Sequence, residues 1–239
     1  SGAKLGWRSR LLDPLTSGLA AIAIGAIAFA FLHKTPQQTP ARAVRFVMDA
    51  PDSLRPFDNY PWPAGVSPDG STVVFASAGP AGIQLYYVRT DQLEPRLIPG
   101  TTDGSQVLFS PDGEWVLFEA GGALKKVRLD GSAPVTIAAA GSNNGADWTS
   151  SDEIVLGSEA AYRGLSKVSA AGGEITEIVK PDSSKGESDY LWPIASPDGK
   201  SIVFTRWLDD LGCADFATVS IDGGDVVPQG VKGIRALGV

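Results

Sequence analysis

Short apolar runs recur at a regular interval along most of this chain, each starting just after a polar turn sequence. The tetrapeptide Ser-Pro-Asp-Gly stands at 67–70, 110–113 and 196–199, and a degenerate copy, Ser-Ser-Asp-Glu, stands at 150–153. Proline presets φ, aspartate bonds nearby main-chain N–H groups and glycine accepts a positive φ, so the tetrapeptide favours a tight turn. Repeats of about 40–46 residues are expected, with one turn each at 68–70, 111–113, 151–153 and 197–199.

Each repeat holds enough alternating apolar positions for four short strands. The first run after each turn lies at 73–75, 116–118, 154–156 or 202–204. A Leu/Phe-x-x-Val strand, a second Gly-containing turn and a last strand follow. Four strands in roughly 43 residues is the size of a β-propeller blade. The pattern therefore predicts an all-β propeller over 44–239 with about four blades.

Phe75, Phe118 and Phe204 end three of these apolar runs at equivalent places, and we expect them to be buried between blades. The apolar alternation over Val44–Met48 predicts one more strand ahead of the first repeat. Propellers often close their ring by lending such a strand to the last blade. We expect this strand to be weakly held, because the last blade is missing from this sequence.

The N-terminal part has a different pattern. Residues 14–32 carry no charged side chain, and as a helix they would span roughly 28 Å, close to the ~30 Å hydrocarbon core of a bilayer. We expect a juxtamembrane segment at 1–13, a transmembrane helix at 14–33 in contact with membrane lipid, and a Pro-rich spacer at 34–43. This organisation implies a single-pass cell-membrane protein.

Two features of the apolar run leave alternatives open. Ala28-Phe29-Ala30 has the form of a signal-peptide cleavage site, although the run is longer than the usual signal core. Ala21 and Gly25 are four residues apart, a spacing that would allow a dimer through this helix.

Charge and composition narrow the function classes. Lys and Arg number 20 against 27 Asp and Glu, a net charge of −7, which argues against a nucleic-acid partner. With His33 and Cys213 as the single His and Cys, a four-ligand Cys/His zinc site and an intrachain disulfide are excluded. Asp209, Asp210 and Asp215 lack the ligand spacing of a calcium loop. We predict no metal and no cofactor.

The pattern Ser-Pro-Asp-Gly-x-x-apolar-apolar-Phe resembles the TolB-type, WD40-like propeller repeat. Over 93–136 the chain is also similar to the extracytoplasmic propeller of bacterial transmembrane serine/threonine kinases of the eukaryotic-like type. The resemblance implies six blades in all, a kinase domain ahead of the membrane helix, and a propeller outside the cytoplasm. The sequence ends in Gly-Val, as does the segment ahead of the first turn, and the spacing of the turns predicts a fifth turn just beyond Val239.

The chain departs from that family in one respect. It contains no Gly-rich phosphate loop and no His-Arg-Asp catalytic loop, and residues 214–217, Ala-Asp-Phe-Ala, are not Asp-Phe-Gly. Phosphoryl transfer needs these parts together, so we expect this chain not to be an enzyme, whatever its parent protein does.

Trp62, Trp148 and Trp192 each precede a turn by a few residues, which places them on or near the innermost strands. Such tryptophans can stack on a ligand or pack between blades. The longest insertion, 207–214, is the best candidate for partner contact. The expected contact residues are Trp62, Trp148, Trp192, Trp207, Asp209 and Asp210.

Lys125, Lys126 and Arg128 form a small basic cluster, which we expect at a solvated strand edge. Because side chains alternate along a strand, Lys126 and Arg128 should lie on one face and Lys125 on the other.

Two function hypotheses remain. The first is a membrane-anchored sensor or interaction propeller that binds a protein, peptide or small ligand, as in a receptor-type serine/threonine kinase whose kinase domain lies outside this sequence. The second is the accessory propeller of a prolyl-oligopeptidase-type hydrolase, whose Gly-x-Ser-x-Gly elbow this chain lacks. A soluble periplasmic TolB-like protein-binding protein is a further alternative, which requires cleavage after Ala30.

Overall fold

The computed structural model describes residues 54–56, 64–79, 82–140, 144–158, 164–208 and 214–233. The chain divides into two compact units, 1–45 and 46–239, and every described residue belongs to the second. The predicted segments at 1–13, 14–33 and 34–43 and the strand at 44–48 therefore lie outside the described residues. Within the described part, no helix has the length and apolar character needed to span a bilayer.

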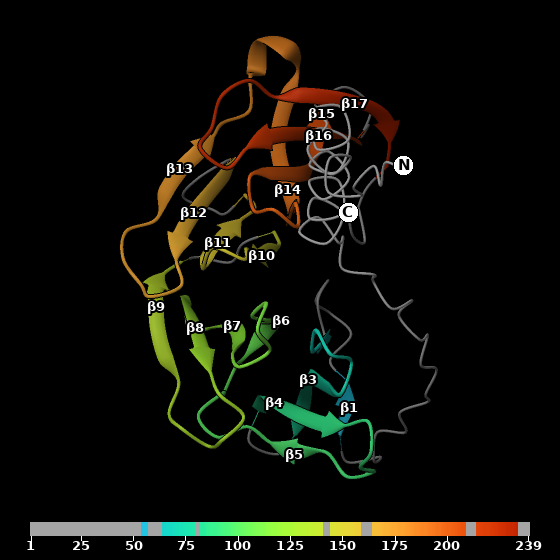
Figure 1. Cartoon of the computed structure of the whole chain (residues 1–239), viewed down its shortest axis with the longest axis vertical. Helices are drawn as coiled ribbons and strands as arrows, with labels where there is room; N and C mark the ends of the chain where they lie inside the picture. Colours follow the sequence, from blue (N-terminus) through green and yellow to red (C-terminus); the bar gives the residue numbers. More distant parts are fainter. Residues whose placement is uncertain are drawn as a thin grey trace, which may run out of the picture. The chain divides into compact units, whose positions relative to one another are not determined.

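Four antiparallel sheets follow one another along the chain, one for each sequence repeat (Figure 1). The first comprises β1 (Arg55–Pro56), β2 (Ala64–Val66), β3 (Thr72–Gly79), β4 (Gly82–Arg89) and β5 (Arg96–Leu97). The second comprises β6 (Ser105–Phe109), β7 (Val116–Ala120), β8 (Ala123–Val127) and β9 (Val135–Ala139). The third comprises β10 (Ala146–Trp148), β11 (Glu153–Leu156), β12 (Leu165–Ser169) and β13 (Thr176–Val179). The fourth comprises β14 (Glu187–Ala195), β15 (Ser201–Leu208), β16 (Ala214–Ser220) and β17 (Val227–Lys232), and a 3₁₀ turn, η2 (Ser183–Lys185), precedes it. The predicted all-β fold is confirmed.

The Ser-Pro-Asp-Gly turns form as predicted. In the first repeat, the Ser67 hydroxyl donates to Asp69 Oδ1 at 2.6 Å and accepts the Thr72 N–H at 2.9 Å, while Gly70 has a φ of 71°. The same serine–aspartate bond and glycine conformation recur at 110–113 and at 196–199. The hydroxyl also holds the carboxylate in its charged form, so the pKa of Asp69 falls to about 2.

The third turn lies one residue earlier than the sequence suggested. Thr149 takes the place of the turn serine, because its hydroxyl accepts the Glu153 N–H at 3.1 Å and bonds to the Ser151 hydroxyl at 3.0 Å. Asp152 takes the place of the glycine, with a φ of 60°. The degenerate copy is therefore 149–152 rather than 150–153. Its turn is one residue shorter than the others, and an aspartate, one of the few residue types that tolerate this conformation, replaces the glycine.

Successive sheets pack face to face through apolar side chains. Val74 packs with Phe118 between the first and second sheets, and Val155 packs with Phe204 between the third and fourth. Phe118 is fully buried and Phe204 is 1% exposed, as predicted. Phe75 is equally buried, but on the face of the first sheet that points away from the second.

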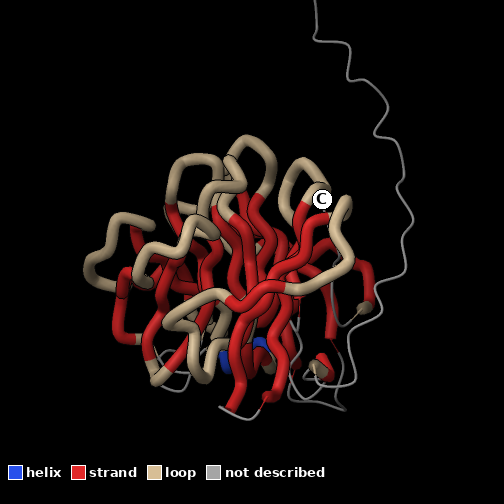
Figure 2. The backbone as a smooth tube through the Cα atoms, turned by 90° about the horizontal axis from the view of Figure 1, so that it is seen from below, coloured by secondary structure: helices blue, strands red, loops and turns tan. Residues whose placement is uncertain are grey.

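Hairpin connectivity places the first strand of each repeat on the same side of its sheet. These inner strands contact one another in sequence order, β2 with β6, β6 with β10 and β10 with β14. Figure 2 shows the strands running alongside one another, with the described loops gathered at their ends. This row of inner strands positions the residues considered next.

Candidate functional site on the inner strands

The inner strands of the second, third and fourth blades share a backbone irregularity four residues before their turns. Gln106, Gly145 and Trp192 have positive φ angles of 55°, 101° and 49°. They stand four residues ahead of Ser110, Thr149 and Ser196, the first residues of their turns. The pairing register also shifts near Gln106 and Trp192, between 105 and 108 and between 191 and 194. The second, third and fourth blades thus share a positive-φ position at the same level of the inner strand, and in the second and fourth blades this position lies in a bulge.

The positive-φ positions of the third and fourth blades, Gly145 and Trp192, lie against each other. The main-chain N–H of Trp192 donates to the carbonyl oxygen of Asn144 at 2.8 Å. A Cβ at Gly145 would lie 2.9 Å from the Trp192 Cα and 3.0 Å from its ring atom Cδ1. Glycine at 145 is therefore required both by its φ and by this close approach.

The predicted inner-strand tryptophans have different surroundings. Trp148 is 5% exposed and packs between the second and third sheets, and its indole N–H donates to Asp152 Oδ1 at 3.1 Å. Trp192 is half-buried, and no acceptor for its buried Nε1 lies among the described residues. Trp62 falls outside the described residues.

Two buried polar groups accompany the bulges. Gln106 Nε2 donates to Glu119 Oε2 at 3.0 Å. Asp147 joins two blades, because its Oδ2 accepts the Ala195 N–H on β14 at 2.7 Å. Burial raises the pKa of Asp147, although hydrogen bonds from the N–H groups of Ala195 and Trp148 oppose the shift.

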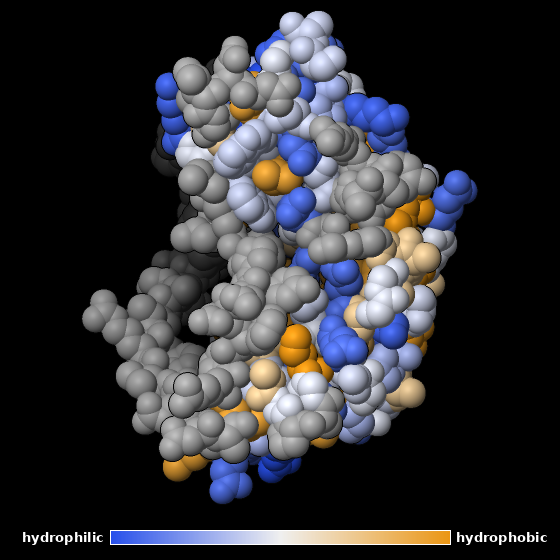
Figure 3. Space-filling model, turned by 180° about the vertical axis from the view of Figure 1, so that it is seen from behind, coloured by the Kyte–Doolittle hydropathy of each residue, from blue (hydrophilic) through white to orange (hydrophobic). Residues whose placement is uncertain are grey.

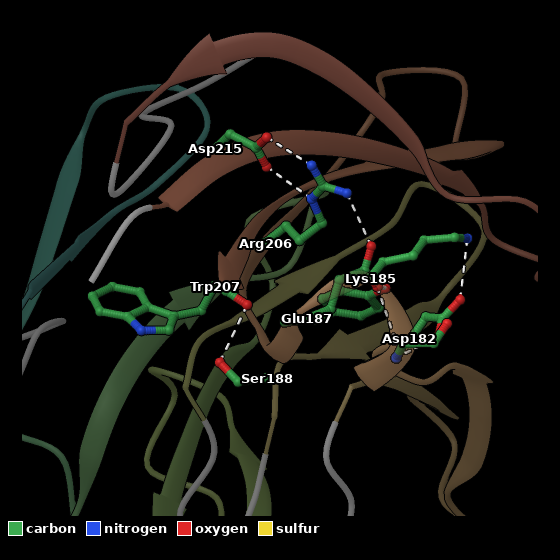
Figure 4. A network of polar contacts seen from close by, with 9 residues as sticks. Asp182, Lys185, Glu187, Ser188, Arg206, Trp207 and Asp215 are labelled. Atoms are coloured by element: carbon green, nitrogen blue, oxygen red, sulfur yellow. Dashed lines mark hydrogen bonds and ion pairs between the residues drawn. The ribbon is translucent and has the colours of Figure 1, made fainter. Parts of the chain in front are cut away.

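A buried ion-pair network closes the end of the fourth sheet (Figure 4). The guanidinium of Arg206 binds Asp215 through two hydrogen bonds of 2.9 and 2.7 Å and binds Glu187 Oε1 at 2.9 Å. The other oxygen of Glu187 accepts from the Tyr190 hydroxyl and from the Asp182 N–H. Burial works to raise the pKa of Glu187, but the hydrogen bonds from Tyr190, Asp182 and Arg206 outweigh it and hold the pKa below its usual value.

Sequence reasoning missed this network. Its signal was present in part, because Arg206 and Asp215 are directly paired across β15 and β16. Asp215 is thus engaged by a guanidinium and stays outside any calcium site. The nearby predicted contact residue Trp207 lies on β15, where its carbonyl accepts from the Ser188 hydroxyl at 3.2 Å (Figure 4). Asp209, Asp210 and Cys213 lie outside the described residues.

The basic cluster at 125–128 does not form a solvated strand edge, so that expectation was wrong. β8 is an interior strand that pairs with both β7 and β9. Lys126 Nζ and the Arg128 guanidinium lie 4.5 and 4.8 Å from the ring centre of Trp115, and Arg128 also pairs with Glu114. Lys125 lies on the opposite face of the sheet, as predicted. It is paired across the strands with Phe118, whereas Lys126 is paired with Leu117. The two cations thus have partners within the protein.

The surface between these features is mixed in character. On the face that Figure 3 shows, the orange apolar atoms form small areas separated by hydrophilic ones. The large apolar side chains exposed among the described residues are Val66, Leu93, Leu97, Val135, Val227 and Val231.

No family model matches this sequence. A curated relative, the uncharacterized peptidase YuxL of Bacillus subtilis, is 31% identical over 154 residues, which are 60% of this chain and 21% of the relative. This chain therefore spans about a fifth of that protein's length.

Solved structures match a larger share of this chain than YuxL does. A TolB protein of Agrobacterium tumefaciens matches with a TM-score of 0.57 and 21% identity, over 69% of this chain and 63% of that one. An oligogalacturonate lyase of Vibrio parahaemolyticus matches with a TM-score of 0.58 and 17% identity, over 74% and 53%. The fold is that of the TolB-like propellers. A puromycin-hydrolyzing peptidase of Mycobacterium tuberculosis also matches, with a TM-score of 0.52 and 16% identity, over 70% of this chain but 28% of the peptidase.

Proposed function

We propose that this chain is a non-catalytic interaction module, a TolB-like propeller region that binds a protein or peptide at the bulged end of its inner strands. The observation that carries the proposal is the positive φ repeated at Gln106, Gly145 and Trp192, with a bulge at the first and last of these positions. Non-glycine residues with positive φ cost of order 1–3 kcal/mol each and cluster at binding sites. The inner strands place two such residues at the same level of the fold.

The sequence supports a binding role over catalysis. It has a single His, His33, which lies in the apolar N-terminal part, and it has no Gly-x-Ser-x-Gly elbow. Labelling with a fluorophosphonate probe and assays with peptide-amide and ATP substrates test this directly. Turnover that survives purification of the chain to homogeneity would contradict the proposal.

The proposed setting is a membrane surface. Residues 14–33 would anchor the chain, and the spacer at 34–43 would hold the propeller outside the cytoplasm. An alkaline-phosphatase fusion after Val239 should be active, and deletion of 14–33 should abolish that activity by leaving the fusion inside the cell. An inactive fusion to the intact chain would contradict this orientation. N-terminal sequencing separates an anchor from a signal peptide cleaved after Ala30.

A second candidate is the accessory propeller of a hydrolase. The match to YuxL and the likeness to the puromycin-hydrolyzing peptidase favour it, because in both cases this chain covers less than a third of a longer protein named as a peptidase. Such a propeller would bind peptide for a hydrolase domain encoded downstream. The kinase-linked sensor role rests on the sequence resemblance alone. The complete reading frame distinguishes these two settings. The hydrolase propeller requires a hydrolase domain after Val239, and the kinase-linked sensor requires a kinase domain before residue 1.

A further inference from the structure

The indole N–H of Trp192 is a buried hydrogen-bond donor with no acceptor among the described residues. A buried donor left without a partner costs about 1–3 kcal/mol, and native proteins keep few of them. The neighbouring blade shows the ordinary arrangement, since Trp148 donates to Asp152 at 3.1 Å. The missing acceptor at Trp192 therefore calls for an occupant.

The backbone of Trp192 is fixed in a conformation that tryptophan seldom adopts. Its φ is 49°, and the third blade holds it there through the bond to Asn144 and the close packing on Gly145. The indole is thereby placed beside the inner strand β10, with its five-membered ring against Gly145. A rigid, half-buried aromatic ring with a polar handle is typical of residues that contact ligands.

The charges nearby favour a neutral acceptor. Asp147 lies two residues after Gly145 on β10, and its carboxylate accepts from the N–H groups of Ala195 and Trp148 without a cation among the ion pairs of the described residues. The chain as a whole has a net charge of −7. A carboxylate or phosphate ligand would be repelled at this position, whereas an amide carbonyl oxygen would accept the N–H without that penalty.

We propose that Trp192 contacts the main chain of a bound peptide and donates its indole N–H to a peptide carbonyl oxygen. This inference rests on the proposed interaction function and names the ligand class and one residue that recognises it. Trp192 acts as a binding residue at the bulged end of the inner strands, and Gly145 positions it.

The test uses the full chain, residues 1–239, and random linear 12-residue peptides displayed on phage. Enriched peptides are synthesised with a fluorescent label, and their affinities are measured by anisotropy against wild type, Trp192→Phe and Trp148→Phe. Phenylalanine keeps an aromatic ring and removes the donor. We expect at least a tenfold loss of affinity for Trp192→Phe and less than a twofold change for Trp148→Phe. Far-UV circular dichroism checks that each variant is folded.

A second measurement is independent of any ligand. Both substitutions remove ring atoms, but only Trp148→Phe also leaves a bonded acceptor, Asp152, without its donor. Trp192→Phe should therefore lower the free energy of unfolding by less than Trp148→Phe. A loss in Trp192→Phe as large as that in Trp148→Phe would show that the indole N–H is already satisfied, and this would overturn the inference.

The outcomes separate the two proposals. Peptides that bind wild type and Trp192→Phe equally well would refute the role of Trp192 and leave the interaction function standing. Failure to enrich any peptide would count against both. Binding on an oligosaccharide array that Trp192→Phe abolishes would assign the donor to a sugar hydroxyl and overturn the peptide assignment.

Discussion

Arg206→Met is expected to be among the most destabilising single changes of a charged residue in this propeller. The guanidinium is the single cation bound to Glu187 and Asp215 among the described ion pairs. The methionine would keep most of the packing of the arginine stem but leave two carboxylates facing each other without a counter-charge.

The magnitude follows from how little solvent reaches the network. The side chains of Arg206, Glu187 and Asp215 are 12%, 3% and 18% exposed. Removing one partner from a buried ion pair costs about 3–5 kcal/mol, because the remaining charge is buried without compensation. Glu187 keeps the bonds from Tyr190 and Asp182 on its second oxygen, so we expect the lower half of that range.

Arg128→Met is the matched control. Arg128 also pairs with a glutamate, Glu114, but these side chains are 39% and 56% exposed. An exposed pair is worth about 0–1 kcal/mol. Both variants lose one arginine and one Arg–Glu pair, while Arg206→Met also breaks the pair with Asp215 and Arg128→Met the contact with Trp115. The difference between them therefore compares a buried network with an exposed pair.

The assay is equilibrium unfolding of the full chain in urea, followed by far-UV circular dichroism at pH 7 and again at pH 3. Glu187 has a pKa below its usual 4.5, so the network contributes stability above about pH 4.5 and loses it as the pH falls through the lowered value. The penalty for Arg206→Met should therefore shrink at pH 3, and Glu187→Gln in the same background should recover part of the loss at pH 7. An Arg206→Met variant within 1 kcal/mol of Arg128→Met at pH 7 would refute the reasoning.

Three further predictions follow from the turns and the core. Ser67→Ala should raise the pKa of Asp69 from about 2 toward 3.8, measured by carboxyl-carbon NMR titration. Because that pKa is lowered, wild type should lose stability as the pH falls from about 4 to about 2, and Ser67→Ala should lose less; an unshifted pKa would contradict the hydrogen bond. In urea unfolding, Phe118→Ala should lower the free energy of unfolding by about 3–5 kcal/mol. Leu93 is 94% exposed, so Leu93→Ala should lower it by less than about 0.5 kcal/mol. Equal losses would show that the face assignment is wrong. Gly145→Ala should lower both the free energy of unfolding and peptide affinity by displacing Trp192, and an unaltered variant would show that the close contact can relax.

The repeat made most of the fold predictable. Three copies of Ser-Pro-Asp-Gly fixed the turns, because each residue of the tetrapeptide has a separate physical reason to be there. The degenerate copy lies one residue earlier than its sequence suggests. Asp152 resembles the turn aspartates in sequence, but it occupies the positive-φ position that glycine holds in the other turns. The hydroxyl of Thr149, which bonds the Glu153 N–H, was the signal that would have placed it correctly.

The faces of the strands were predictable, but the contacts between blades were not. Alternation placed Lys126 on the face opposite Lys125, as found. It could not show that Lys126 would lie 6.0 Å from the ring centre of Trp148 in the next blade, nor that Lys167 would pair with Asp222 in the next blade. Such contacts depend on how two sheets are placed side by side, which a single repeat does not encode.

The positive-φ positions of the inner strands show which part of the site could not be predicted from the sequence. Gly145 alone signals a positive φ, whereas glutamine and tryptophan at 106 and 192 predict regular strand. The three positions are equivalent in their place four residues ahead of a turn, and at Gly145 the neighbouring Trp192 lies so close that a methyl group would not fit. The backbone is shared but the side chains differ: a glutamine bonded to Glu119, a glycine, and a tryptophan whose N–H has no acceptor among the described residues. That combination of a common geometry with different side chains is how a repeat scaffold acquires a specific site, and it is the reason that Trp192, rather than the fully buried Trp148, carries the expectation of ligand contact.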